Sequence, residues 1–280
     1  TGETDGSLLD EAARNASAAD VAVVFVGLPD ASESEGADRA DMALPAGHNA
    51  LVERVCAANP NTVVVLQGGS PVELPWRGLP RAVLLCYLAG CRGGQAAADL
   101  LLGRANPSGK LAETWPVRLA DTPCAAYFPE KGRQARYRES VYTGYRYYDA
   151  AGAEVAYPFG HGLSYTEFSY HDLRVEEADD GFSVSFAVRN DGARAGREAV
   201  QLYVAPLEAG AFRPPQELKG FAKAALAPGE ARRMTLPLPR RAFACYDADM
   251  RAWEVEGGAY EVRVAASSRD VRLSARVEVA

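Results

Sequence analysis

The sequence lacks the residues and patterns that mark several common functional classes. Only three of its 280 residues are histidines, and none of its five cysteines forms a C-x-x-C pair, so we expect no metal site and no other cofactor. No apolar run approaches the ~18 residues that a membrane-spanning helix needs. The net charge is −7, and the charges of both signs are mixed along the chain. We therefore expect neither a membrane nor a nucleic acid as a partner.

The cysteines and the first residues say little about where the protein resides. The odd number of cysteines leaves at least one thiol unpaired within the chain, and Cys86 lies in an apolar run, where a free cysteine behaves as a small hydrophobe. This slightly favours a cytoplasmic location. The first six residues are polar and resemble a linker, and Thr1 stands where a start methionine is usual. A fragment of a longer protein is therefore expected, although a removed signal peptide would leave the same pattern.

The first 105 residues contain apolar runs of strand length that alternate with helical patterns. The runs cover residues 21–27, 62–66 and 82–88, and helices are predicted over residues 8–18, 45–58 and 94–102. An apolar run without alternation is typical of a strand that is covered on both faces of a parallel sheet. The pattern predicts an α/β sandwich domain with an open, mainly parallel sheet.

From residue 170 the period of the pattern changes to two. Apolar and polar residues alternate over residues 182–188 and 260–264, and turn residues separate four further strand-like runs. About seven short strands in ~110 residues predict a fibronectin type III-like β-sandwich, because the cysteine and tryptophan spacing of antibody domains is absent. We expect an α/β domain over residues 1–115, a Tyr-rich connector over 116–169 that packs on it, and the sandwich over 170–280.

One acidic loop, residues 31–41, is a candidate for chemistry. It follows the first strand, and ligands of open α/β sheets bind outside the carboxyl ends of the strands. Glu35 precedes Gly36, which allows the backbone to turn and present the carboxylate, while Asp38 and Arg39 are candidates for an ion pair. Residue types alone favour a simpler interpretation, in which a solvated acidic loop caps the following helix.

Other candidate sites are weaker. The turn at residues 67–70 follows a strand but matches no phosphate-binding motif, and Pro71 and Pro75 disrupt the helix that would hold a phosphate. The three histidines have no telling neighbours, and His161 between two glycines is most simply a turn residue. The tyrosines of the connector are candidates for stacking on sugar rings, but packing in a core is favoured.

A series of short motifs runs through nearly the whole chain in a fixed order. The motifs are Glu35-Gly-Ala-Asp-Arg39, Leu44-Pro45, Thr62-Val-Val-Val-Leu66, Gly69-Ser-Pro71, Asn106-Pro-Ser-Gly-Lys-Leu111, Tyr142-Thr-Gly-Tyr-Arg-Tyr-Tyr148, Pro158-Phe-Gly-His-Gly-Leu-Ser-Tyr165, Asn190-Asp-Gly192, Gln216-Glu-Leu-Lys-Gly220 and Gly258-Ala-Tyr260. In this order they resemble the C-terminal half of glycoside hydrolase family 3, of the bacterial β-glucosidase type.

The resemblance implies a retaining active site shared between this part and a barrel domain of ~250 residues that the chain has no room for. Glu35 matches the general acid/base of the family, with Glu33 as the fallback. A retaining glycosidase needs a second carboxylate ~5 to 5.5 Å away as nucleophile. In the family this is an aspartate in a Ser-Asp-aromatic segment of the barrel, and no such tripeptide occurs here.

The expected function is therefore that of the C-terminal part of a retaining β-glucosidase, acting on β-linked oligosaccharides or glycosides together with the absent barrel and inactive alone. β-Xylosides or arabinofuranosides are alternative substrates, because the residues that bind the sugar would lie mainly on the barrel. A non-catalytic carbohydrate-binding or scaffolding module is the alternative function. A nucleotide-binding flavodoxin-like domain is disfavoured by the prolines that follow Gly69.

Overall fold

The computed structural model describes residues 3–36, 38–128, 134–208 and 212–280. The chain forms two compact units. The first consists of residues up to 105 with residues 116–122, and the second of residues 106–115 with the residues from 123 onward. None of the helices in the described ranges is long and apolar enough to cross a membrane.

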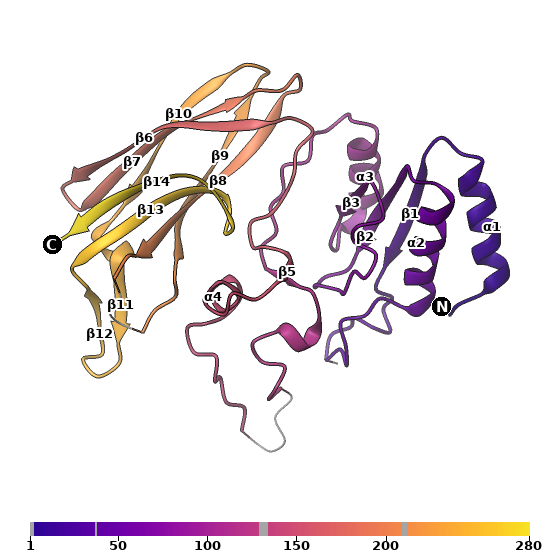
Figure 1. The fold of residues 1–280 in the computed structure, drawn as a ribbon, viewed down its shortest axis with the longest axis horizontal. Helices are drawn as coiled ribbons and strands as arrows, with labels where there is room; N and C mark the ends of the chain where they lie inside the picture. Colours follow the sequence, from indigo (N-terminus) through magenta and orange to yellow (C-terminus); the bar gives the residue numbers. More distant parts are fainter. Residues whose placement is uncertain (1–2, 37, 129–133, 209–211) are drawn as a thin grey trace. The chain divides into compact units, whose positions relative to one another are not determined.

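The first unit is an α/β layer built on three parallel strands in the order β1-β2-β3 (Figure 1). Its elements are α1 (Gly6–Ser17), β1 (Ala22–Gly27), α2 (Ala46–Ala58), β2 (Thr62–Gln67), β3 (Ala82–Leu85), the 3-10 turn η1 (Gly90–Arg92) and α3 (Gly93–Leu101), with the 3-10 turn η2 (Leu119–Asp121). The predicted α/β fold with a parallel sheet is confirmed.

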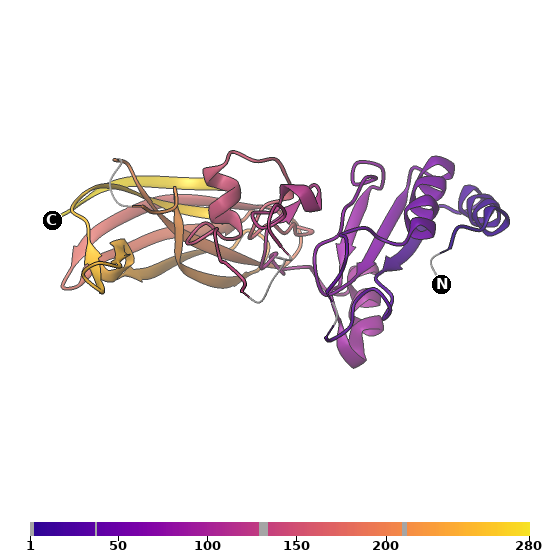
Figure 2. The same cartoon turned by 90° about the horizontal axis from the view of Figure 1, so that it is seen from below.

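Helix α2 covers one face of this sheet. Its Val52 and Val55 are buried, as are Val24 of β1 and Val64 of β2, and α1 lies beside α2 (Figures 1 and 2). The side chain of Asn59, which follows α2, donates hydrogen bonds to the carbonyls of Ala16 and Ala19, so the end of α1 is fastened to the end of α2. These bonds satisfy carbonyls that a helix end leaves without partners.

Strand β1 is covered on one face only, which corrects the expectation that both faces are buried. Ala22, Val24 and Val26 are buried, whereas Val23 and Phe25 are 43% and 57% exposed. Helix α2 packs on one face of β1. Within the described ranges β1 pairs with β2 alone, so it also forms one edge of the sheet. The third strand is also shorter than the predicted 82–88. It ends at Leu85, and two residues later the positive φ of Tyr87 (48°) is incompatible with an extended backbone.

The second unit contains the β-sandwich. It includes α4 (Tyr145–Ala150), the 3-10 turn η3 (Arg240–Phe243), and the strands β5 (Val155–Tyr157), β6 (Phe168–Ala178), β7 (Gly181–Asn190), β8 (Gly196–Pro206), β9 (Glu217–Leu226), β10 (Ala231–Leu238), β11 (Ala244–Asp247), β12 (Ala252–Val255), β13 (Gly258–Ser267) and β14 (Asp270–Val279); β4 (Trp115–Pro116) pairs with β5. One antiparallel sheet has the order β10-β7-β6 and the other β14-β13-β8-β9, while β11 and β12 form a hairpin. The predicted fibronectin type III-like sandwich is confirmed.

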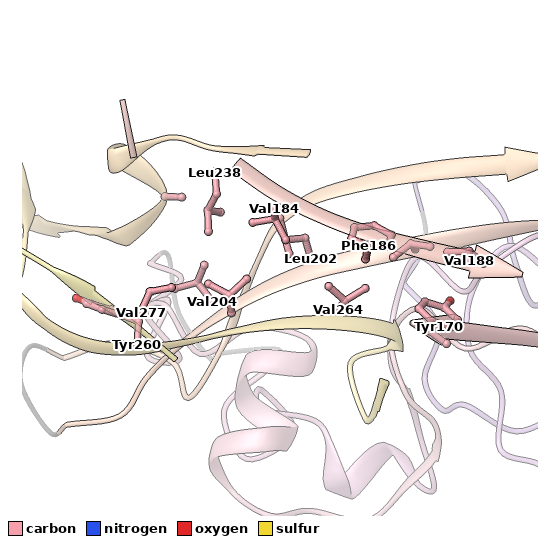
Figure 3. Close-up of a cluster of buried hydrophobic side chains, with 14 of the residues drawn as sticks. Tyr170, Val184, Phe186, Val188, Leu202, Val204, Leu238, Tyr260, Val264 and Val277 are labelled. Carbon is pink, nitrogen blue, oxygen red and sulfur yellow. The ribbon is translucent and has the colours of Figure 1, made fainter. Parts of the chain in front are cut away.

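The core of the sandwich lies between its two sheets, where the inward-facing side chains of both sheets meet (Figure 3). Val184, Phe186 and Val188 of β7 are fully buried, and so are Leu202 of β8 and Val264 of β13. Burying a side chain of this size contributes about 1.5–3 kcal/mol. The period of two that the sequence shows over residues 182–188 therefore marks the face of β7 that forms this core.

The described part of the Tyr-rich segment, residues 123–128 and 134–169, belongs to the same compact unit as the sandwich. The ring of Tyr145 stacks on Phe159 with centroids 5.0 Å apart and meets Tyr203 of β8 edge-on. Its hydroxyl accepts a hydrogen bond of 2.8 Å from the backbone N–H of Leu218. The boundaries 1–115, 116–169 and 170–280 stay predictions.

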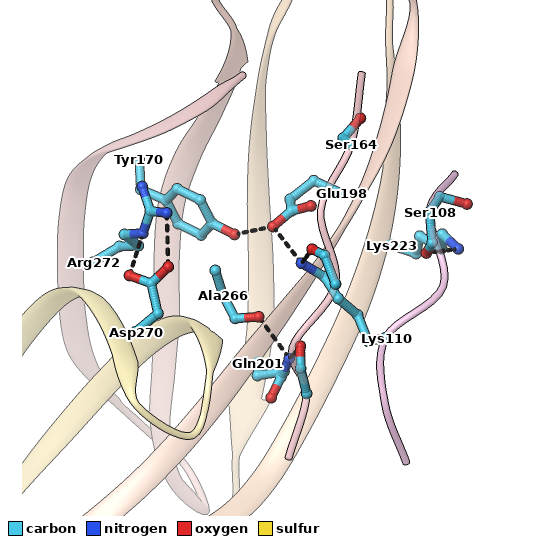
Figure 4. A network of polar contacts seen from close by, with 12 residues as sticks. Ser108, Lys110, Ser164, Tyr170, Glu198, Gln201, Lys223, Ala266, Asp270 and Arg272 are labelled. Carbon is cyan, nitrogen blue, oxygen red and sulfur yellow. Dashed lines mark hydrogen bonds and ion pairs between the residues drawn. The ribbon is translucent and has the colours of Figure 1, made fainter. Parts of the chain in front are cut away.

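A buried polar network also joins the segment before β4, which contains Lys110, to the sandwich (Figure 4). The ammonium of Lys110 lies 3.2 Å from the carboxylate of Glu198 on β8, and the two side chains are only 14% and 8% exposed. Tyr170 of β6 donates its hydroxyl to the same carboxylate at 2.8 Å. Because a buried charge is costly without partners, this carboxylate requires both Lys110 and Tyr170.

Candidate functional site

The acidic loop begins where β1 and β2 end side by side. Gly27 is in register with Gln67, and the N–H of Leu28 donates to the carbonyl of Gln67 at 3.0 Å. The chain then turns at Pro29, whose carbonyl accepts from the N–H of Ser32 at 2.8 Å. The loop therefore leaves the carboxyl end of a parallel strand, as the sequence predicts. Ala37 lies outside the described residues.

Glu33 is bound to the turn that follows β2. Its Oε2 accepts a hydrogen bond of 2.7 Å from the N–H of Gly69, and its Oε1 accepts one of 3.0 Å from the hydroxyl of Ser70. Gly69 makes this approach possible, because a Cβ at that position would lie 3.0 Å from Oε1 of Glu33 and 3.1 Å from Leu88. Both carboxylate oxygens of Glu33 therefore have structural partners.

Glu35, two residues later, is in a different environment. Its side chain is exposed and, within the described ranges, accepts no hydrogen bond. Gly36 has a φ of +82° with nothing within 4 Å of where a Cβ would stand, so its backbone conformation, and not crowding, requires glycine. The turn at Gly36 leaves the carboxylate of Glu35 free for a second surface or a substrate.

Arg39 ties the other end of the loop to the same turn. Its Nη1 donates to the hydroxyl of Ser70 at 2.9 Å and to the carbonyl of Pro71 at 3.1 Å. Asp38, the expected partner of Arg39, is exposed, and no ion pair between the two is found among the described residues. Ser70 thus joins Glu33 and Arg39, which the sequence places six positions apart.

Two alternative interpretations of this region, a helix cap and a phosphate loop, do not hold. The described residues of the loop do not cap α2, since the residue before that helix is Pro45 and none of their side chains caps its first turn. The carboxylate of Asp41 accepts instead from the N–H of Ala43. The turn at residues 67–70 is not an open phosphate loop either, because the N–H of Gly69 already binds Glu33.

The histidines have local roles. Nδ1 of His48 lies 3.0 Å from the carbonyl of Gly27, and His171 contacts the hydroxyl of Ser169. His161 stacks on Tyr157 with ring centroids 5.2 Å apart, and burial together with the positive charge of Lys110 lowers its pKa. Among the residues that the structure describes, no three His, Cys, Asp or Glu side chains gather as a metal site.

The described tyrosines of α4 belong to the core, as the sequence favours. Tyr148 is 4% exposed, and Tyr145 is held between Phe159 and Tyr203. A cavity of about 470 Å³ lies between the edge strands β9 and β10, lined by residues 218–221, 236 and 237. The acidic loop contributes no residue to it, so this cavity is not the site of Glu35.

Sequence reasoning missed Gly69, Ser70 and Pro71 as partners of the loop. Gly69 and Ser70 lie 36 and 37 positions from Glu33, and no spacing rule joins residues that far apart. The one usable signal is that both segments follow apolar strands, since neighbouring parallel strands bring their carboxyl ends to one edge of the sheet.

Comparisons with known proteins agree with this architecture. A model described as the glycosyl hydrolase family 3 C-terminal domain matches residues 5–165, and one described as a fibronectin type III-like domain matches residues 198–268. Thermostable beta-glucosidase B of Acetivibrio thermocellus is 48% identical over 279 residues, which are 98% of this chain and 37% of that protein. Exo-alpha-(1->6)-L-arabinopyranosidase of Bifidobacterium longum is 42% identical, over 95% of this chain and 36% of that protein.

Solved structures show the same likeness. The GH3 beta-glucosidase of Bifidobacterium adolescentis matches with a TM-score of 0.95 and 42% identity, over 99% of this chain and 41% of that one. Beta-glucosidase from Kluyveromyces marxianus in complex with glucose matches with a TM-score of 0.95 and 39% identity, over 99% of this chain and 34% of that one. The chain therefore spans 34–41% of the length of these relatives. It belongs to glycosyl hydrolase family 3, and it is the C-terminal region of that architecture.

Proposed function

We propose that this chain is the C-terminal part of a retaining β-glucosidase and that Glu35 is its general acid/base. The observation that carries the proposal is the contrast between two neighbouring glutamates. Glu33 has both carboxylate oxygens bound, whereas the carboxylate of Glu35 is exposed and has no hydrogen bond within the described ranges. A group that must exchange protons with a substrate and with water needs this freedom.

In the first step, a carboxylate nucleophile attacks the anomeric carbon and the glycosidic C–O bond breaks. Glu35 gives its proton to the departing oxygen. In the second step, the Glu35 carboxylate takes a proton from a water molecule, whose oxygen attacks the same carbon and displaces the nucleophile. Two inversions leave the product in the β configuration.

The nucleophile is assigned to a barrel domain outside this chain. No Ser-Asp-aromatic tripeptide occurs in the sequence, and the chain covers only 37% and 41% of two of its relatives, so more than half of each relative lies outside the shared region. A second surface over Glu35 also has a chemical use, because removing water from a carboxyl group favours its protonated form. On this proposal the chain alone does not hydrolyse glycosides.

Complementation tests this proposal. We expect the chain alone to leave 4-nitrophenyl β-D-glucoside unhydrolysed and to restore turnover when it is joined to the barrel region of a family 3 relative. Glu35→Gln in the joined protein should remove that turnover. Enzyme-like rates from the chain alone would contradict the proposal. Saturable glucose binding by the chain alone, unaffected by Glu35→Gln and without restored turnover, would favour a non-catalytic carbohydrate-binding module.

A second candidate substrate follows from the relatives named as exo-alpha-(1->6)-L-arabinopyranosidases, which are 42% identical to this chain. The joined protein is therefore assayed with 4-nitrophenyl α-L-arabinopyranoside beside the β-D-glucoside. The ratio of the two kcat/KM values ranks the substrates, since that ratio measures discrimination. The β-xyloside and the arabinofuranoside belong in the same series.

A further inference from the structure

Two ends of the acidic loop are anchored to one short turn. Glu33 binds Gly69 and Ser70, and Arg39 binds Ser70 and Pro71. A serine hydroxyl has one proton to donate and two lone pairs to accept with. The hydroxyl of Ser70 can therefore donate to Glu33 and accept from Arg39 at the same time.

Glu35 lies between these two anchors. Its own side chain contributes no hydrogen bond within the described residues, so the side-chain hydrogen bonds that hold the loop to the turn after β2 come from Glu33 and Arg39. Hydrogen bonds to an ionised carboxylate or guanidinium are about twice as strong as neutral ones. Glu33 and Arg39 make four hydrogen bonds to the turn, and three of them involve the hydroxyl of Ser70 or the N–H of Gly69.

We infer that Glu33 is a positioning residue, which with Ser70 and Arg39 holds the loop against the turn after β2 and so fixes where Glu35 is presented. The contacts of these three residues do not depend on the role proposed for Glu35, but their effect on catalysis rests on it. We call Glu33, Arg39 and Ser70 the Ser70 clamp. Glu33 is less suited than Glu35 to proton transfer with a substrate, because each of its oxygens already accepts one hydrogen bond.

The clamp is tested first in this chain, by hydrogen exchange followed with mass spectrometry. Glu33→Gln keeps the shape of the side chain but removes its charge and one acceptor oxygen. We expect roughly tenfold faster exchange in peptides covering residues 28–41 and 67–72, because local opening becomes easier. Ser70→Ala should act in the same way. Glu35→Gln is the matched control and should exchange like the wild type.

Peptides from β13 in the same samples report whether each variant is folded, since its Val262 and Val264 are fully buried. If Glu33→Gln and Ser70→Ala both exchange like the wild type over residues 28–41, the clamp does not exist. If β13 peptides stay protected while the loop is released, the effect is local, and the inference is supported even for a destabilised variant.

Catalysis is tested in the chain joined to a family 3 barrel. A misplaced general acid matters most for leaving groups that need protonation. We expect Glu33→Gln and Ser70→Ala to lower kcat/KM for an alkyl β-glucoside by on the order of 10- to 100-fold, and kcat/KM for the 2,4-dinitrophenyl glucoside much less. The comparison uses kcat/KM because the second step, which needs Glu35 as a base, is the same for both substrates. The limb of the pH profile that reports the general acid should persist, because Glu35 is still present in both variants.

The outcomes separate this inference from the proposed function. Suppose that Glu33→Gln loses the limb of the pH profile that reports the general acid, while hydrogen exchange over residues 28–41 stays like that of the wild type. Glu33 would then be the acid/base itself, and the positioning role would be overturned. An active Glu35→Gln variant would overturn the proposed function while leaving a clamp seen by exchange intact. Equal losses of kcat/KM for both leaving groups would contradict positioning of the acid.

Discussion

The carboxylate of Glu33 accepts a hydrogen bond of 2.7 Å from the backbone N–H of Gly69, across 36 positions of sequence. This bond joins the exits of two neighbouring parallel strands, which end in register at Gly27 and Gln67. It distinguishes Glu33 from Glu35, which are the two candidates for the general acid/base in the sequence. Glu33 is part of the framework of the loop, and Glu35 stands outside it.

Replacing Gly69 by alanine should weaken this framework. The new Cβ would stand 3.0 Å from Oε1 of Glu33 and 3.1 Å from Leu88, so one of them must move. We expect Gly69→Ala to lower the free energy of unfolding by about 1 kcal/mol and to speed exchange over residues 28–41. Gly78→Ala is the control, because nothing lies within 4 Å of its Cβ position. Equal urea midpoints for the two variants would contradict the close approach.

The ion pair of Lys110 and Glu198 should matter far more than an exposed pair. Lys110→Met leaves a carboxylate that is 8% exposed without its cation, and such a loss typically costs about 3 kcal/mol. Arg276→Met is the control, because Arg276 and Glu278 are 65% and 64% exposed and exposed pairs contribute roughly 0–1 kcal/mol. Urea unfolding measures both. A Lys110→Met variant as stable as Arg276→Met would show that Glu198 does not need this partner.

His161 should make the fold sensitive to mild acid. Burial and then the charge of Lys110 lower its pKa, and Asp270 opposes them. An unfolded histidine titrates near a pKa of about 6.5, so below that pH the unfolded chain binds more protons than the folded one. The contribution is therefore complete above the unfolded pKa and is lost as the pH falls through the folded value.

The urea midpoint at pH 7.5 and at pH 5.5 checks this prediction. The wild type should lose more stability between the two than His161→Gln, which lacks the titrating group. His171→Gln is the matched control, because His171 is exposed on β6, and it should lose as much as the wild type. If His161→Gln and the wild type lose stability equally, His161 has no part in the acid sensitivity.

Much of the fold can be predicted from the sequence, because short local patterns of apolar and polar residues indicate where the strands lie and which face is buried. The alternation over residues 182–188 corresponds to the buried face of β7, and the apolar run at 62–66 corresponds to β2. The run at residues 21–27 was misleading on one point. Its exposed residues Val23 and Phe25 are as apolar as its buried ones. The composition of the run therefore does not reveal that β1 is covered on one face only.

The site is less predictable, because its contacts join residues far apart in sequence. Glu35 stands out by its neighbour Gly36 and by resemblance to a family, whereas the bonds from Glu33 and Arg39 to Ser70 depend on how β1 and β2 pair. The hairpin of β11 and β12 was missed for a similar reason. It has only four residues in each strand, too few to display a clear period.

The most direct test of the account is the product that Glu35→Gln forms with azide, in the chain joined to a family 3 barrel and supplied with 2,4-dinitrophenyl β-D-glucoside. This leaving group departs without a proton, so the glucosyl-enzyme forms, and azide then attacks without the help of a base. The account predicts that azide accelerates Glu35→Gln and yields β-glucosyl azide, whereas Glu33→Gln gives glucose. β-Glucosyl azide from Glu33→Gln and not from Glu35→Gln would contradict it.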